Sequence, residues 1–168
     1  MKKPSLLLAS ILAITATSAA MAATSGGSFQ VLITVAKACS VTAGNASNID
    51  FGTVNSSATG LVASSNISVT CSKTTPYNVG LMPSNTNTVG AGAMTSTSGG
   101  SDSVAYQLRS VSATGPVWGN TATPTAVGNG VAGTGTGVAQ VIPVFATVAN
   151  ANVTPGDYAD TVTVQVNY

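Results

Sequence analysis

An alternating apolar segment near the N-terminus constrains the fold most strongly. Residues 28–37 read Ser-Phe-Gln-Val-Leu-Ile-Thr-Val-Ala-Lys. Successive side chains of a β-strand point to opposite faces. One face of a strand here carries Phe29, Val31, Ile33 and Val35. We therefore expect a strand with a wholly apolar face, which must be buried either in the chain's own domain or in another molecule.

Residues 1–22 have the features of a signal peptide. Lys2 and Lys3 give it a positive start, residues 6–14 form a short apolar run, and Ala20-Met21-Ala22 matches a cleavage signal. The apolar run is too short for a good membrane span, which argues against an uncleaved anchor. We expect cleavage after Ala22, or alternatively after Ala23, and an exported mature chain with no membrane span.

The two cysteines predict one disulfide bond. Cys39 and Cys71 are the only cysteines, and both follow the leader. An even number of cysteines in an exported chain is typical of disulfide pairing. A metal pair or a nucleophile is disfavoured, because the chain has no histidine to complete a Cys-His site. Closing this loop stabilises a fold by roughly 3–4 kcal/mol.

Short alternating segments separated by turn residues follow the first cysteine. We expect strands at 40–43, 49–54, 66–72, 77–82, 103–111, 138–148 and 157–168, a hairpin within 85–100, and a long loop at 114–137 with a short strand at 117–118. Pro143 indicates an edge or a bulge in its strand. Since no helical period occurs outside the leader, the pattern predicts a single all-β sandwich domain.

The last predicted strand, 157–168, has the strongest alternation. One face carries Tyr158, Val162, Val164, Val166 and Tyr168, interrupted only by Asp160. No further strand follows in the sequence to pair with it. We therefore expect a bare apolar edge, which promotes aggregation unless another segment covers it.

The charged residues do not suggest catalysis, cofactor binding or nucleic-acid binding. Charged residues make up 5% of the chain, and three cations and four aspartates follow the leader, a formal charge of −1. This excludes a basic patch for nucleic acid and shows no acidic cluster for a metal. Asp157 and Asp160 are expected on opposite faces of a strand, and no histidine can activate the many hydroxyls. We do not expect an enzyme.

Six short motifs follow one another along the mature chain. They are Phe29–Val35 just before Cys39, Phe51-Gly52, Ile67–Cys71, Val104–Leu108, Val117–Gly119 and the ending Pro155–Tyr168. Together they resemble the spore coat protein U domain family, which includes the pilin subunits of archaic chaperone–usher pili of Gram-negative bacteria. The ending is the most specific motif. Ala146 departs from the pattern, since a glycine is expected at or near it.

The resemblance implies an incomplete immunoglobulin-like β-sandwich that is completed by a donated strand. Residues 1–22 are then the signal peptide, 23–37 the N-terminal donor strand and 38–168 the pilin domain. The donor residues are Phe29, Val31, Ile33 and Val35, and the acceptor-groove residues are Tyr158, Val162, Val164, Val166 and Tyr168. The implied partners are a periplasmic chaperone, an outer-membrane usher and neighbouring pilin subunits in a head-to-tail polymer.

The implied role is a structural subunit of a bacterial surface pilus, exported through the periplasm and serving adhesion or biofilm formation. A single domain with a donor strand favours a shaft subunit over a tip adhesin. The alternative function is a self-contained secreted β-sandwich that coats a surface or binds carbohydrate. In that case residues 29–35 fold back into their own domain.

Overall fold

The computed structural model describes residues 21–168. This part of the chain contains nine strands and one short 3-10 helix. The strands are β1 Cys39–Thr42, β2 Thr59–Cys71, β3 Pro76–Pro83, β4 Ala91–Ser96, β5 Ser103–Ser110, β6 Val131–Thr134, β7 Gln140–Asn150, β8 Tyr158–Ala159 and β9 Val162–Asn167, and the 3-10 helix is Asn45–Ser47. They all lie in one compact unit, Val35–Tyr168. The predicted signal peptide lies outside the described residues, apart from Met21 and Ala22.

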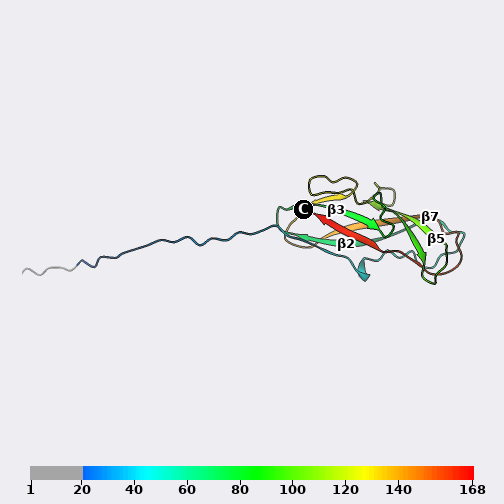
Figure 1. Cartoon of the computed structure of the whole chain (residues 1–168), viewed down its shortest axis with the longest axis horizontal. Helices are drawn as coiled ribbons and strands as arrows, with labels where there is room; N and C mark the ends of the chain where they lie inside the picture. Colours follow the sequence, from blue (N-terminus) through cyan, green and yellow to red (C-terminus); the bar gives the residue numbers. More distant parts are fainter. Residues whose placement is uncertain (1–20) are drawn as a thin grey trace, which may run out of the picture. The chain divides into compact units, whose positions relative to one another are not determined.

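The strands form two antiparallel sheets, as shown in Figure 1. One sheet has the order β1-β2-β7-β5-β4-β8, and the other has the order β6-β3-β9. The inward-facing residues of alternating strands pack between the sheets, with Val69, Val79 and Leu81 no more than 1% exposed. The predicted all-β, immunoglobulin-like sandwich is confirmed.

Trp118 closes the core from a long connection rather than from a strand. It is completely buried, and its indole Nε1 donates a hydrogen bond to the carbonyl oxygen of Val79 at 2.9 Å. The predicted strand at 117–118 amounts to one isolated bridge, between Val117 and Arg109. The predicted loop 114–137 also contains a strand that sequence reasoning missed, β6, which pairs with β3.

The predicted strand at 49–54 is wrong, since no residue of this segment belongs to a strand. A side-chain carboxylate oxygen of Asp50 accepts the N–H of Gly52 at 2.7 Å, and Gly52 has a φ of 67°. This local turn replaces strand pairing. Ile49 and Phe51 nevertheless pack against the core, which accounts for their apolar spacing.

Pro143 lies where one side of β7 is open. β7 runs between β2 and β5, but its pairing with β5 covers Val144 to Thr147 and stops there. Pro143 follows directly outside that ladder, so the strand is locally an edge and the missing N–H is tolerated. Ala146 pairs regularly with Leu108 and with Ala63, so the ladder accommodates it without a glycine.

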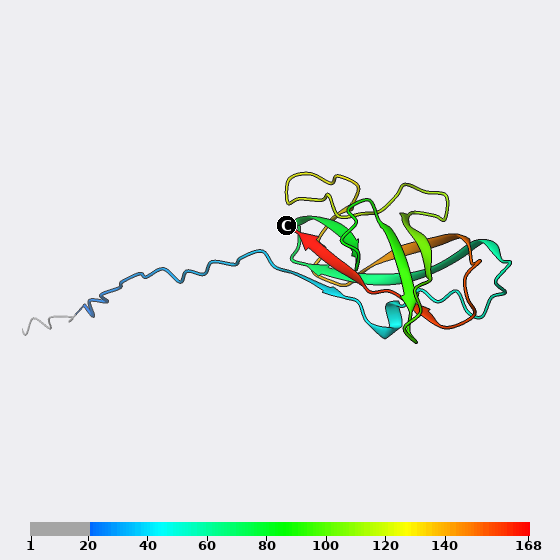
Figure 2. The ribbon, with the colours of Figure 1, turned by 45° about the vertical axis from the view of Figure 1, so that its right-hand side comes forward.

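The predicted last strand, 157–168, is divided between the two sheets. β8 pairs with β4 in the six-stranded sheet, whereas β9 pairs with β3 in the three-stranded sheet. Figure 2 shows β9, in red, beside β3, in green. Asp160 and Thr161 form the crossing between the sheets. The alternation expected for one strand therefore continues across a change of sheet.

Candidate functional site: a groove along the last strand

β9 has a strand on one side only. It pairs with β3, and its other edge forms no ladder with any strand among residues 21–168. The N–H of Leu81 donates to Gly119, away from β9, and Leu81 lies opposite Val164. Directly opposite residues of an antiparallel ladder either bond to each other or both point away. The main-chain groups of Val162, Val164 and Val166 therefore point to the open edge.

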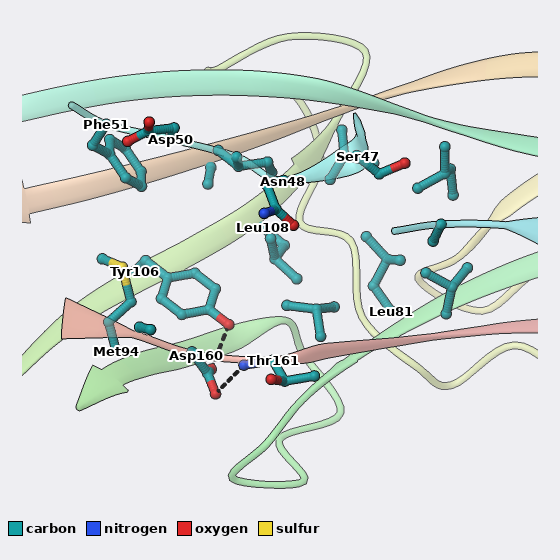
Figure 3. Close-up of a pocket in the computed structure, with 18 of the residues that line it drawn as sticks. Ser47, Asn48, Asp50, Phe51, Leu81, Met94, Tyr106, Leu108, Asp160 and Thr161 are labelled. Atoms are coloured by element: carbon teal, nitrogen blue, oxygen red, sulfur yellow. Dashed lines mark hydrogen bonds between the residues drawn. The ribbon is translucent and has the colours of Figure 1, made fainter. Parts of the chain in front are cut away.

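A groove of about 560 Å³ follows this edge between residues 158–164 and the segment 43–51. Besides β4, β8 and β9, the strands β2, β3, β5 and β7 supply apolar side chains to it. These side chains are Ile67, Leu81, Leu108, Val144 and Ala146. Figure 3 shows Leu81 and Leu108 within the groove, with Phe51 and Met94 nearer one end. An extended peptide in this groove meets apolar side chains and also unpaired main-chain donors and acceptors.

Three of the five predicted acceptor residues line this groove. Tyr158, Val162 and Val164 line it and are half-buried. Val166 is also half-buried but lies beyond the groove, and Tyr168 is 39% exposed. The Nζ atom of Lys37 lies 5.9 Å from the centre of the Tyr168 ring. The structure thus brings three of the five predicted residues into the groove.

One end of the groove is polar because Asp160 lies there. Its Oδ2 accepts the hydroxyl of Tyr106 at 2.6 Å, and its Oδ1 accepts the N–H of Thr161 at 2.8 Å, as drawn in Figure 3. Burial raises the pKa of Tyr106 far above its usual value, and the hydrogen bond to Asp160 and its charge add to the shift. Tyr106 therefore remains a protonated donor at physiological pH.

Sequence reasoning missed the role of Tyr106. Its alternation with Val104 and Leu108 places it among inward-facing strand residues, which is correct. Nothing in the sequence pattern indicates that its hydroxyl meets a carboxylate 54 residues away. A buried tyrosine hydroxyl usually has a hydrogen-bond partner, so a partner could have been expected but not identified.

The predicted N-terminal strand is not formed in the single chain. Residues 21–38 have no regular secondary structure. Phe29, Val31, Ile33 and Val35 are between 81% and 88% exposed. A strand needs a neighbour to satisfy its main-chain groups, and this segment has none.

The predicted disulfide is present and anchors the start of the domain. Cys39 is bonded to Cys71, and the two residues are opposite partners in the β1–β2 ladder. The N–H of Ala38 also donates to the side-chain oxygen of Ser72 at 3.0 Å. The N-terminal segment is thus joined to the sheet at a covalently fixed point.

Nothing among residues 21–168 suggests metal binding or a membrane-spanning helix. No group of three or more His, Cys, Asp or Glu side chains gathers in this part of the chain. No helix there is both long and apolar enough to cross a membrane. The arrangement can bind an extended apolar strand, and its chemistry is that of main-chain hydrogen bonding and side-chain burial.

Among solved structures, the chain is similar to a chain in the crystal structure of the CsuC–CsuE chaperone–tip adhesion subunit pre-assembly complex from the archaic chaperone–usher Csu pili of Acinetobacter baumannii. The identity is 28% and the TM-score 0.51, over 80% of this chain and 40% of the other. The chain thus spans less than half of that relative. The E. coli Hda pilus minor tip subunit HdaB is more distant, with 14% identity and a TM-score of 0.42 over 78% of this chain and 82% of the other.

No curated protein sequence matches the chain. The model of the Spore Coat Protein U domain matches residues 25–165, which is most of the sequence. This match includes the exposed N-terminal segment as well as the sandwich. The chain belongs to the spore coat protein U domain family.

Proposed function

We propose that the chain is a structural subunit of a bacterial chaperone–usher pilus, in which the N-terminal segment of one copy completes the sandwich of the next. The observation that carries this proposal is the groove along β9, with an open main-chain edge and apolar side chains. The same chain carries an exposed segment of matching alternation, Phe29 to Val35. Adding a strand to an exposed sheet edge is a known mode of protein recognition.

The expected free energies favour a stable contact between the N-terminal segment of one copy and the groove of the next. Burying four large apolar side chains contributes roughly 6–12 kcal/mol at about 1.5–3 kcal/mol each. Main-chain hydrogen bonds along β9 add about 0.5–1.5 kcal/mol each. Association entropy opposes these gains. Because the donor and acceptor surfaces are different, the contact is head-to-tail and yields a filament where it does not close into a ring.

The comparisons support the proposed partners and location. The similar crystal structure is of a chaperone–subunit complex from archaic chaperone–usher pili. By analogy, a periplasmic chaperone covers the groove of this chain before assembly, an outer-membrane usher catalyses the exchange, and the chain reaches the cell surface after signal-peptide cleavage. The pilus then serves adhesion or biofilm formation, and the role of the subunit is structural rather than enzymatic. The exposed segment Phe29 to Val35, as a donor strand for a neighbouring copy, favours a shaft subunit.

Deleting residues 24–35 from the chain tests this function. We expect the deleted protein, co-expressed with its chaperone and usher, to be captured by the chaperone but to form no fibres in negative-stain electron microscopy. A matched control replaces the same residues with a Gly/Ser segment of equal length, which keeps the spacing but not the apolar face. Fibres of normal length from either variant would refute the proposal.

A further inference from the structure

We propose, on the basis of the strand exchange above, that Asp160 fixes the register of the incoming strand by forming an ion pair with Lys37 of the neighbouring copy. The donor face and the acceptor face are both nearly uniform in apolar character. The donor face ends at Lys37, the fifth residue of the alternating series that begins at Phe29. The acceptor face changes to a carboxylate at Asp160, two residues before the start of β9 at Val162.

A charged pair is needed to fix the register, because the apolar pattern alone cannot select a single register. The donor offers Val31, Ile33 and Val35, and β9 offers three further valines at equal spacing. A slip of one residue would turn the apolar face outward, but a slip of two keeps it inward. Burial of apolar side chains therefore discriminates poorly between registers that differ by two residues.

The paired register follows from antiparallel geometry. All strand pairs of this domain are antiparallel, and directly opposite residues in such a pair share a face. Placing Ile33 opposite Val164 makes a complete ladder. Its pairs are Phe29 with Tyr168, Val31 with Val166, Ile33 with Val164, and Val35 with Val162. The next same-face pair in this ladder is Lys37 with Asp160.

Both slips by two residues are penalised by charge. One slip places Val35 opposite Asp160, so that an apolar side chain covers the carboxylate. The other places Lys37 opposite Val162, in the apolar part of the groove. Either arrangement desolvates a charge without pairing it, which is unfavourable. Only the register with Ile33 opposite Val164 gives both charges a partner.

Both charged groups are available for this contact. Asp160 is half-buried and lines the groove. Its hydrogen bonds come from Tyr106 and Thr161, neither of which carries a positive charge. Each carboxylate oxygen can accept a further hydrogen bond. Lys37 is exposed, and its contact with the Tyr168 ring is at 5.9 Å.

Cysteine cross-linking of the full chain, co-expressed with its chaperone and usher, measures the register. We expect Ile33→Cys combined with Val164→Cys to give a covalent ladder on non-reducing gels. Two further double variants report the slipped registers. Ile33→Cys with Val162→Cys reports the slip that places Val35 opposite Asp160, and Ile33→Cys with Val166→Cys reports the slip that places Lys37 opposite Val162. These should cross-link about tenfold less, the ratio that a preference of about 1.4 kcal/mol produces.

Charge reversal then tests the ion pair. Lys37→Asp should reduce the 33–164 cross-link about tenfold or shift it to a slipped pair, and adding Asp160→Lys should restore it. Since Asp160→Lys removes the acceptor for Tyr106, the milder Lys37→Gln and Asp160→Asn provide readouts that keep the domain folded. Lys73→Asp, at another exposed lysine, is the matched control and should change nothing.

The outcomes separate this inference from the proposed function. Equal cross-linking at all three cysteine pairs would refute the ion pair but not strand exchange. An unchanged 33–164 cross-link in the Lys37→Asp variant would have the same meaning. Fibres without a 33–164 ladder would do the same. The ion pair is supported if the Lys37 and Asp160 single variants lose fibres and every cross-link while the Lys73→Asp control keeps them. The double reversal of Lys37 and Asp160 should then restore both. Fibres that persist after deletion of residues 24–35 would refute strand exchange itself.

Discussion

The N-terminal segment Phe29–Val35 and the last strand β9 have the same alternating pattern and different structures. Val162, Val164 and Val166 of β9 are half-buried beside β3. The donor-face side chains of the N-terminal segment are at least 81% exposed, and the segment has no strand partner. β3 completes the series, since its Val79 pairs with both β6 and β9 and is 0% exposed.

Burial thus increases with the number of neighbouring strands rather than with the strength of the alternation. Val79 of β3 has two neighbouring strands and is completely buried, the inward valines of β9 have one and are half-buried, and the N-terminal segment has none and stays exposed. Alternation specifies which residues can share a face. It does not determine which strand will pair with that face.

The largest effect is expected from charging the N-terminal segment. Ile33→Asp places a carboxylate in the apolar donor face and should abolish fibre assembly, as judged by electron microscopy. Because Ile33 is 87% exposed in the single chain, the free energy of unfolding should change by no more than about 0.5 kcal/mol. Leu32→Asp is the matched control, since Leu32 is 82% exposed on the opposite face. Equal loss of assembly from both variants would contradict a face-specific joint.

The disulfide supports the sandwich but not the exposed segment. Replacing Cys39 and Cys71 by serine should lower the free energy of unfolding by roughly 3–4 kcal/mol, because the unfolded chain regains the entropy of the closed loop. Urea denaturation of the chaperone-free protein measures this difference. Reduction of the wild-type protein with a thiol should give the same loss, and a loss below about 1 kcal/mol would show that β1 is held mainly by other contacts.

Tyr106 supports the start of β9. Tyr106→Phe removes the hydrogen bond to Asp160 and should cost about 1.5–3 kcal/mol at neutral pH, the range for hydrogen bonds to charged groups. The pKa of Tyr106 is raised by folding. Its contribution is therefore complete below the unfolded value of about 10 and is lost as the pH rises above it.

Thermal unfolding between pH 8 and 11 should consequently decline less steeply for Tyr106→Phe than for the wild type. Folding also raises the pKa of Tyr77 through burial, so some alkaline decline remains. A variant with the same alkaline decline as the wild type would argue against a buried, protonated Tyr106.

The smallest effect is expected in β9 itself. Val164→Ala removes methyl groups that are only half-buried and should cost about 1 kcal/mol or less in the single chain. Val79→Ala is the matched control on β3, where complete burial should raise the cost to about 2–3 kcal/mol. Chemical denaturation of the two variants provides the comparison. If a donated strand completes the burial of Val164 in assembled fibres, the cost of Val164→Ala there should approach that of Val79→Ala.

Much of this architecture was predictable from local patterns. The strands at 66–72, 77–82, 103–111 and 138–148 correspond to β2, β3, β5 and β7, although β2 starts earlier, at Thr59. The failures were at turns. The segment 49–54 has strand-like apolar spacing, but the bond from Gly52 to Asp50 turns it away from a ladder. β6 was missed because Val131–Thr134 is short and rich in small residues.

The sequence by itself determined most of the strand-forming segments, the Cys39–Cys71 disulfide and the membership of a family. These depend on residue types and on spacings of two, which are local properties. Only the tertiary structure decided that the last strand changes sheets at Asp160, that Tyr106 bonds to Asp160, and that strands distant in the sequence line one groove. Those features depend on which strands become neighbours, and contacts between residues tens of positions apart leave no periodic signal in the chain.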